Sequence, residues 1–578
     1  MRMRNVPKFR KVPKGLGRHE PLKHADHPKP TTRRQFLAQG FMTGTASVLL
    51  PSGLSMLIGP RVAKAQTCGT PTTLACDIQS AVTACGITTG AGMIPFVCFD
   101  LSGGGNIAGS NVLIGGPGGQ LDFLSVAGYS KQGLPGTMVP NSSTTSFVDS
   151  SLGLRYHSDS GHLRGIKSRF SNPTFMANVT GTVIPALSQN DTNTNPHNPV
   201  YGIYQAGARG ALLNLIGTDS STSGGNSMAP PAMVNISAQP TVIDSGQDTA
   251  GLVSTGQLST LLPNSSDVTN VLESMKRISD AKYSQVTAYS AAMSGGAAAN
   301  ANALGASGTQ ACAYTKSAYI LNKYPNPGAV DPDDDPLIVG AATSIFNTTE
   351  YQQSSDFQMT AAVMKLVIDG DAAAGTIQLG GFDYHTGERA TGEGRDFDAG
   401  TCIGAVLQYA ALRGKPVMIY VFSDGSLASD GTIDTSVGGR DKGVWTADNG
   451  SVAATYWLIY NPAGKAVTAQ SNTEMSLQLG YMNPDGSQNT TSSPAGNNVP
   501  NLAQIVVLNY MALHSTAAAA AWPSIWPGYT SAVWPYSPSP TPVSGPNTVN
   551  TLGSGAAALD PLIMYQPLAG LQGGKVPG

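Results

Sequence analysis

The stretch TCIGAVLQYAALRGKPVMIYVFSDG, residues 401–425, decides the fold class. Its first part carries apolar residues at helical spacing: Ile403, Val406, Leu407 and Ala410. Gly414 then supplies a helix stop, and PVMIYVFSDG follows as an apolar run without polar alternation, which is typical of a strand covered on both faces. A helix, a glycine and a buried strand in succession predict an α/β fold with a largely parallel sheet.

Other segments extend this pattern along the chain. MIPFVCFDL at 93–101 and TYWLIY at 455–460 are further predicted strands, and NLAQIVVLNYMALHS at 501–515 is a predicted helix. The segments 217–231 and 483–499 are rich in Gly, Ser and Asn. Their composition predicts long loops or an inserted subdomain between the regular elements.

The first 65 residues are typical of a twin-arginine export signal. Arg33 and Arg34 precede a mildly apolar segment, which ends at Ala63-Lys64-Ala65 and predicts cleavage before Gln66. A membrane anchor is the alternative, but glycine and proline interrupt a segment already rich in Ser and Thr. We therefore expect the twin-arginine export machinery as a partner, no stable membrane anchor, and a periplasmic or secreted location.

The charge of the expected mature chain limits its partners. Thirteen of the 33 Lys and Arg residues, but only two of the 35 acids, lie in residues 1–65. The remainder has 20 basic and 33 acidic residues, a net charge of −13. So acidic a chain argues against nucleic acid and against an anionic membrane surface as partners.

Composition divides the chain into four expected parts. After the signal at 1–65 comes a Cys-containing segment at 66–92, where an oxidising compartment would permit a disulfide among Cys68, Cys76 and Cys85. The α/β domain spans 93–515. The tail at 516–578 is rich in Pro and Trp, and we expect it to pack on the body or to offer a surface to a protein partner.

Acidic residues end three of the predicted strands. Asp100, Asp424 and the pair Asp383 and His385 stand at the ends of FVCFD, VMIYVFSD and TIQLGGFDYH. The carboxyl ends of parallel strands meet at one sheet edge, where ligands collect. One acid at a strand end is commonly a loop cap, but three acids and a histidine suit zinc, manganese, magnesium or calcium.

Several motifs in this order resemble those of one protein family. FDLSGGGNIAGSN, NTNPHNPVYGIYQAG, GGFDYH, VFSDGS and GGRDKGVW follow one another from Phe96 towards His514. This order is similar to that of exported bacterial proteins of unknown function that have a twin-arginine leader and an alkaline-phosphatase or sulfatase-like fold. The resemblance implies a three-layer α/β/α sandwich, a divalent metal ion and hydrolysis of phosphate or sulfate esters.

The chain departs from the family pattern at two places. Lys442 stands where the family has a histidine, and Pro196-His197 replaces a Ser-His pair. An ammonium group cannot ligate a metal, so we expect Lys442 to lie with Asp383 and His385 as an internal cation. The candidate catalytic residues are then Ser102, His197 and Lys442, and Ser423 is a second hydroxyl at a strand end.

Two functions therefore remain open. The first is a metal-dependent ester hydrolase, with Asp100, Asp383, His385 and Asp424 as metal ligands. The second is a cell-envelope or secreted binding or assembly protein that kept the fold and lost the chemistry. The acid-rich VDPDDDPL at 330–337 lacks the glycine and distal glutamate of a helix-loop-helix calcium site, and we expect a solvated loop there.

Overall fold

A computed structural model of the chain describes residues 91–141, 146–188, 194–253, 327–469, 473–518 and 562–576, with parts of 267–278, 317–324 and 520–521. The predicted export signal, Cys68, Cys76 and Cys85 lie outside the described residues, as do all three tryptophans of the tail. Cys98 is buried and not in a disulfide, which confirms the buried thiol that its apolar surroundings suggest. No helix within the described residues combines the length and apolarity needed to cross a membrane.

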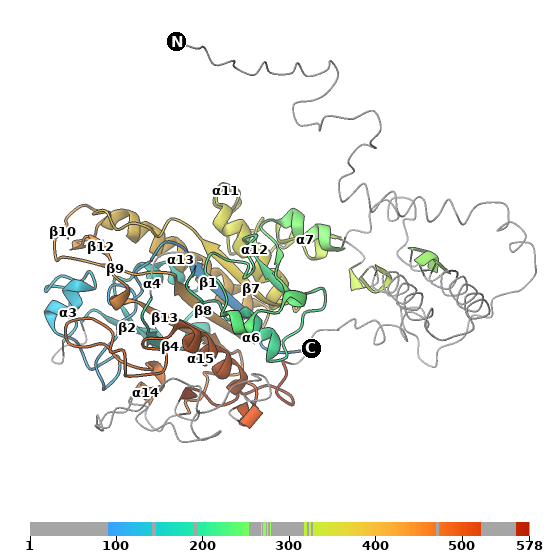
Figure 1. The fold of residues 1–578 in the computed structure, drawn as a ribbon. Helices are drawn as coiled ribbons and strands as arrows, with labels where there is room; N and C mark the ends of the chain where they lie inside the picture. The colour runs from blue at the N-terminus through green and yellow to red at the C-terminus, as the bar shows by residue number, and fades with distance from the viewer. Residues whose placement is uncertain are drawn as a thin grey trace, which may run out of the picture. The chain divides into compact units, whose positions relative to one another are not determined.

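A seven-stranded sheet forms the centre of the molecule (Figure 1). The strand order is β4-β13-β8-β1-β7-β5-β6, and only β13 runs against the others. The strands are β1 (Phe96–Leu101), β4 (Val179–Pro185), β5 (Leu213–Gly217), β6 (Thr241–Val242), β7 (Ala372–Leu379), β8 (Val417–Ser423) and β13 (Ala454–Tyr460). The predicted largely parallel sheet is therefore confirmed.

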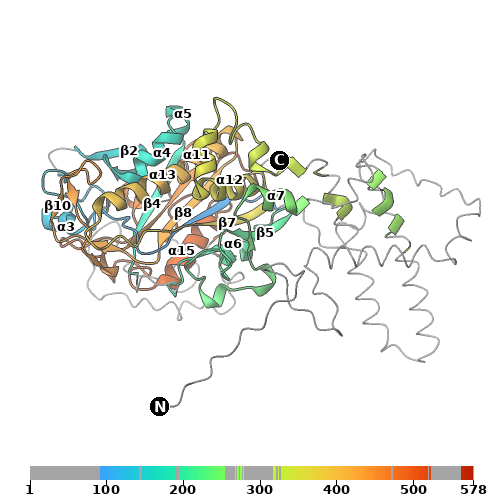
Figure 2. The same cartoon turned by 90° about the horizontal axis from the view of Figure 1, so that it is seen from above.

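Helices cover both faces of this sheet, as Figures 1 and 2 show. Alternate side chains of β1 divide between two cores: Val97, Phe99 and Leu101 face one, and Phe96 and Cys98 face the other. The first core includes α4 (Gly161–Arg169), α12 (Ser355–Ile368) and α13 (Arg389–Leu412). The second includes α6 (Val200–Gln205) and α15 (Val499–Ala512). This is the predicted three-layer sandwich.

Shorter elements connect these layers. The helices are α3 (Val126–Lys131), α5 (Pro173–Met176), α7 (Gly246–Val253), α11 (Thr348–Gln353) and α14 (Thr473–Leu477), with 3-10 turns at Pro231–Met233, Ile236–Ala238, Pro327–Ala329, Pro332–Asp334 and Gly450–Val452. Three small antiparallel pairs join β2 (Val148–Leu152) to β3 (Leu154–His157), β10 (Ile433–Asp434) to β11 (Lys442–Gly443), and β12 (Ala447–Asp448) to β9 (Leu427–Ala428).

Two predicted loop regions acquire a definite structure. The VDPDDDPL segment forms a 3-10 turn that Asp331 caps, and Asp335 pairs with Lys365 at 2.7 Å. In the tail, Leu562, Met564 and Tyr565 belong to the same core as α15. The described end of the tail therefore packs on the body, which is one of the two outcomes that we expect for it.

Candidate functional site

Strands β1, β7 and β8 end at one edge of the sheet. Leu101 pairs with Leu379 on β7 and with Ser423 on β8, so the three strands are in step where they finish. Asp100 is the second-last residue of β1, and Asp424 follows β8 directly. The sequence therefore placed these acids correctly at the carboxyl edge of a parallel sheet, together with the segment that leads to Asp383 and His385.

Asp100 and Asp424 are both fully buried at this edge. The backbone N–H of Ser227 donates to Asp100 Oδ2 at 2.7 Å, and the Ser227 hydroxyl donates to Oδ1 at 3.1 Å. Asp424 accepts from the Gly103 N–H at 2.8 Å and from the Asn226 side chain at 2.5 Å. Each carboxylate oxygen of both acids thus accepts a hydrogen bond from the protein.

The loop at 217–231 covers these two carboxylates. It was expected as a Gly, Ser and Asn-rich loop, and it supplies both Asn226 and Ser227. A Cβ atom on Gly225 would lie 2.7 Å from Asp100 Oδ2, so the loop can approach this closely only because residue 225 is glycine. Burial and the nearby Asp424 charge raise the pKa of Asp100 to about 7.

A glycine turn after β1 fixes the other side of the edge. Gly103 has φ +114°, and a Cβ there would lie 2.6 Å from the Asp383 backbone nitrogen. The Gly105 N–H donates to Ser423 Oγ at 2.8 Å, and that hydroxyl donates to the Leu101 carbonyl at 2.6 Å. Ser423 therefore ties β8 to the turn. The Ser102 hydroxyl is buried and has no hydrogen-bond partner among the described residues.

Asp383, His385 and Asp448 form a more accessible group at the same edge. His385 Nε2 lies 2.9 Å from Asp383 Oδ1 and 3.7 Å from Asp448 Oδ2. The side chains of Asp383, His385 and Asp448 are 61%, 32% and 45% exposed. Asp448 reaches the group through the short β9-β12 pair, because β9 begins only a few residues after the end of β8. Asp448 could not be found from the sequence, since no apolar run or motif marks it.

These three side chains fit a divalent metal ion. One ligand atom from each lies within 4.8 Å of the other two. Zinc in tetrahedral coordination holds its ligand atoms about 3.3 Å apart, which lies between the two distances from His385 Nε2. One imidazole nitrogen and two carboxylate oxygens also match the donors that zinc and manganese prefer. Asp383 and His385 remain metal candidates, and Asp448 takes the place expected for Asp100 or Asp424.

His197 lies beneath the edge and away from solvent. Its ring stacks on Phe422 with centroids 5.8 Å apart, and its Nε2 is 3.5 Å from Ser188 Oγ. Burial lowers the pKa of His197 to about 3, so the imidazole is neutral. The Ser188 hydroxyl donates to the Asp424 carbonyl at 2.5 Å. These contacts give His197 a packing role next to Asp424.

Lys442 does not pair with Asp383, beside which it was expected, but with two other acids. Its Nζ lies 2.8 Å from Glu393 Oε1 and 3.3 Å from Asp159 Oδ2, and it donates to the Asp159 carbonyl at 2.6 Å. The side chain is fully buried. The structure therefore pairs Lys442 with Glu393 and Asp159 and not with Asp383 or His385. Glu393 lies in the polar first half of α13, which the sequence analysis did not recognise as helical.

No family model, curated protein or solved structure matches this chain. The family resemblance therefore rests on the short motifs, and the firm conclusion is a mixed α/β fold with a seven-stranded, mostly parallel sheet.

Proposed function

We propose that this chain is an exported protein that binds one divalent metal ion through Asp383, His385 and Asp448, and that it works as a binding or assembly protein and not as an ester hydrolase. The observation that carries the proposal is the contrast at the carboxyl edge. Asp383, His385 and Asp448 are accessible, and their ligand atoms lie close together. Asp100 and Asp424, in contrast, are buried and hydrogen-bonded.

The state of the buried acids argues against hydrolysis of the alkaline-phosphatase kind. Both side chains are fully buried, so a metal ion would have to enter the closed part of the edge before it could reach Asp100 or Asp424. It would also need the 217–231 loop to leave the edge, because Gly225 lies against Asp100. Three ligands from the accessible group leave coordination positions open, where either a ligand atom of a partner or a water molecule can bind, so the open positions do not by themselves separate the two functions.

One observation favours hydrolysis as a second candidate. The Ser102 hydroxyl has no hydrogen-bond partner among the described residues and stands directly after β1. A hydroxyl next to a metal ion is a common nucleophile in ester hydrolysis. Ser102 is therefore the residue whose substitution separates the two functions.

The test combines metal content with turnover. The purified mature protein is loaded with zinc or manganese and desalted, and metal is then measured by mass spectrometry. Turnover of 4-nitrophenyl phosphate and 4-nitrophenyl sulfate is measured on the same samples. We expect about one metal ion per chain and no more turnover than in Ser102→Ala. Metal-dependent turnover that Ser102→Ala abolishes would establish the hydrolase, and absence of bound metal would refute the proposed site.

A further inference from the structure

An open surface cavity of about 430 Å³, lined mostly by exposed residues, lies beside the ion pairs of Lys442. Its walls are Met138, Asp159, the consecutive residues Thr435, Ser436 and Val437, and then Arg440 and Asp441. None of these residues belongs to the Asp383, His385 and Asp448 group. The cavity therefore offers a site whose function does not depend on the proposed metal ion.

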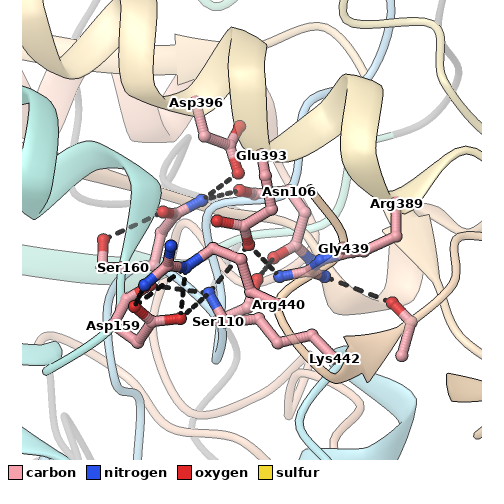
Figure 3. Close-up of polar contacts among 12 residues, drawn as sticks. Asn106, Ser110, Asp159, Ser160, Arg389, Glu393, Asp396, Gly439, Arg440 and Lys442 are labelled. Atoms are coloured by element: carbon pink, nitrogen blue, oxygen red, sulfur yellow. Dashed lines mark hydrogen bonds and ion pairs between the residues drawn. The ribbon is translucent and has the colours of Figure 1, made fainter. Parts of the chain in front are cut away.

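Four cations surround two acids next to this cavity, and Figure 3 shows three of them, Arg389, Arg440 and Lys442, with Asp159 and Glu393. We call this the basic cluster: Arg164, Arg389, Arg440 and Lys442, with Asp159 and Glu393. Glu393 accepts from Arg389 and from Arg164, each at 2.5 Å, besides Lys442. Asp159 accepts from Arg440 Nε at 2.8 Å and lies 3.7 Å from Arg164 Nε.

The basic cluster carries two more positive than negative charges. Asp159 stays ionised, because Arg440 and Lys442 lower its pKa to about 2 against the effect of burial. The next acid on α13, Asp396, is buried and near Glu393, and both effects raise its pKa to about 7. Asp441, which lines the cavity, and Asp434 lie outside this count; water screens their charges and, in part, that of Arg440, whose side chain is 38% exposed. Positive charge in a partly buried place attracts an anion.

Arg440 links the cluster to the cavity. Its contacts with Asp159 use Nε and Nη2, so among the described residues Nη1 remains able to donate. Arg440 and Asp441 have φ values of +57° and +56°, an unfavourable conformation for residues other than glycine. The ion pair with Asp159 holds this strained turn, and strain of this kind concentrates at ligand sites.

We propose that this cavity binds the oxyanion of a small molecule, either a carboxylate or a phosphate group. Arg440 Nη1 and the Thr435 hydroxyl are the donors, and Met138 and Val437 contact the apolar part of the ligand. The Ser436 side chain accepts from the Gly439 N–H at 3.0 Å and is hydrogen-bonded to the Asp434 carboxylate, so it shapes the cavity wall and is not counted as a donor. A planar guanidinium suits both oxyanions.

The test uses Val437, because its side chain is 97% exposed and its substitution removes no buried contact. Inorganic phosphate and sodium acetate are titrated calorimetrically into the full mature protein at constant ionic strength, set with sodium chloride. We expect saturable binding of at least one of them, weakened at least tenfold in Val437→Asp, where a carboxylate enters the cavity wall. Val467→Asp, another exposed valine that does not line the cavity, should bind as the natural protein does.

Arg440→Gln supplies a second comparison. It should weaken binding at least tenfold, whereas Arg413→Gln, which breaks a different exposed Arg-Asp pair, should leave binding unchanged. Binding of phosphate alone assigns a phosphate ligand, and binding of acetate alone a carboxylate. Heats equal to those of added chloride, or equal affinity in Val437→Asp and Val467→Asp, would overturn the proposal.

Discussion

Asp100 is a carboxyl group that the fold disfavours in its charged form. It is fully buried, and Asp424 is the nearest source of further negative charge. Its pKa of about 7 in the folded chain exceeds the value of about 4 in an unfolded chain. The contribution of protonated Asp100 to the free energy of unfolding is therefore fully present below pH 4, and it is lost as the pH rises from 4 to 7. The sequence shows only the position of Asp100, since its burial depends on a loop more than 100 residues away.

Asp100→Asn should therefore reduce the dependence of stability on pH. The amide can still accept from the Ser227 N–H and can donate to the Ser227 hydroxyl, so the fold keeps both contacts. The free energy of unfolding of both proteins is measured with urea at pH 4 and at pH 8. Between these pH values, we expect the difference between the variant and the natural chain to shift by roughly 2 to 4 kcal/mol in favour of the variant. Asp334→Asn, at an exposed acid outside the site, is the control. A pH dependence identical to that of the natural chain would contradict the burial of an ionisable Asp100.

Glu393 is the acid that keeps three buried or half-buried cations together. Glu393→Gln removes the only negative charge that Arg389 contacts among the described ion pairs, and it leaves Lys442 and Arg164 with Asp159 alone. We expect a loss of about 3 to 5 kcal/mol in the free energy of unfolding. Glu350→Gln, which breaks the more exposed pair with Arg169, should cost less than about 1 kcal/mol. Equal losses in both variants would show that Glu393 is not the centre of the cluster.

Candidate site residues could be predicted from the sequence only where they end a strand. Asp383 and His385 follow β7 within a few residues, so their place at the sheet edge was predictable. Asp448 lies on a two-residue strand, and its partner β9 is recognisable only in the folded chain. Lys442 was singled out because it stands where the family pattern has a histidine, but its partners Glu393 and Asp159 come from α13 and from the turn before α4.

At the scale of elements, α4 and α13 pack through glycines. A Cβ on Gly165 would lie 2.1 Å from the Phe397 carbonyl, and one on Gly400 would lie 2.2 Å from the His162 carbonyl. Real Cβ atoms do not approach backbone atoms so closely, so only glycine permits this spacing. The two helices bring Arg164 and Glu393 together, and close packing therefore positions the basic cluster.

Gly400→Ala should destabilise the chain although alanine is the better helix former. The new methyl group meets the α4 backbone, and we expect a loss of about 1 to 3 kcal/mol in thermal or urea unfolding. Gly394→Ala on the same helix meets nothing within 4 Å and should gain up to about 1 kcal/mol. If both variants gained stability, the two helices would have to lie farther apart than the structure places them.

Regular elements were predictable to the extent that their burial is uniform. β1 and β8 are buried along their whole length, and their uninterrupted apolar runs revealed them. The helix predicted before Gly414 is the apolar half of α13, which begins at Arg389. Its first turns carry Arg389, Glu393 and Asp396, which are held by ion pairs and hydrogen bonds. Because these side chains are polar, hydrophobic periodicity could not reveal this half of the helix.

For the whole molecule, the carboxyl edge of the sheet has a closed part and an open part. The 217–231 loop and the glycine turn after β1 close it over Asp100 and Asp424. Asp383, His385 and Asp448 remain accessible beside them. The acids at the strand ends predict one metal site of Asp100, Asp383, His385 and Asp424, whereas we assign metal binding to the open part only.

Calorimetric titration of zinc into three matched proteins tests this central claim most directly. The natural chain, Asp448→Asn and Asp100→Asn are first stripped with a chelator and dialysed. We predict that Asp448→Asn binds zinc at least about tenfold more weakly, because it loses a carboxylate ligand, and that Asp100→Asn binds as the natural chain does. Loss of zinc binding in Asp100→Asn, with natural affinity in Asp448→Asn, would contradict the account.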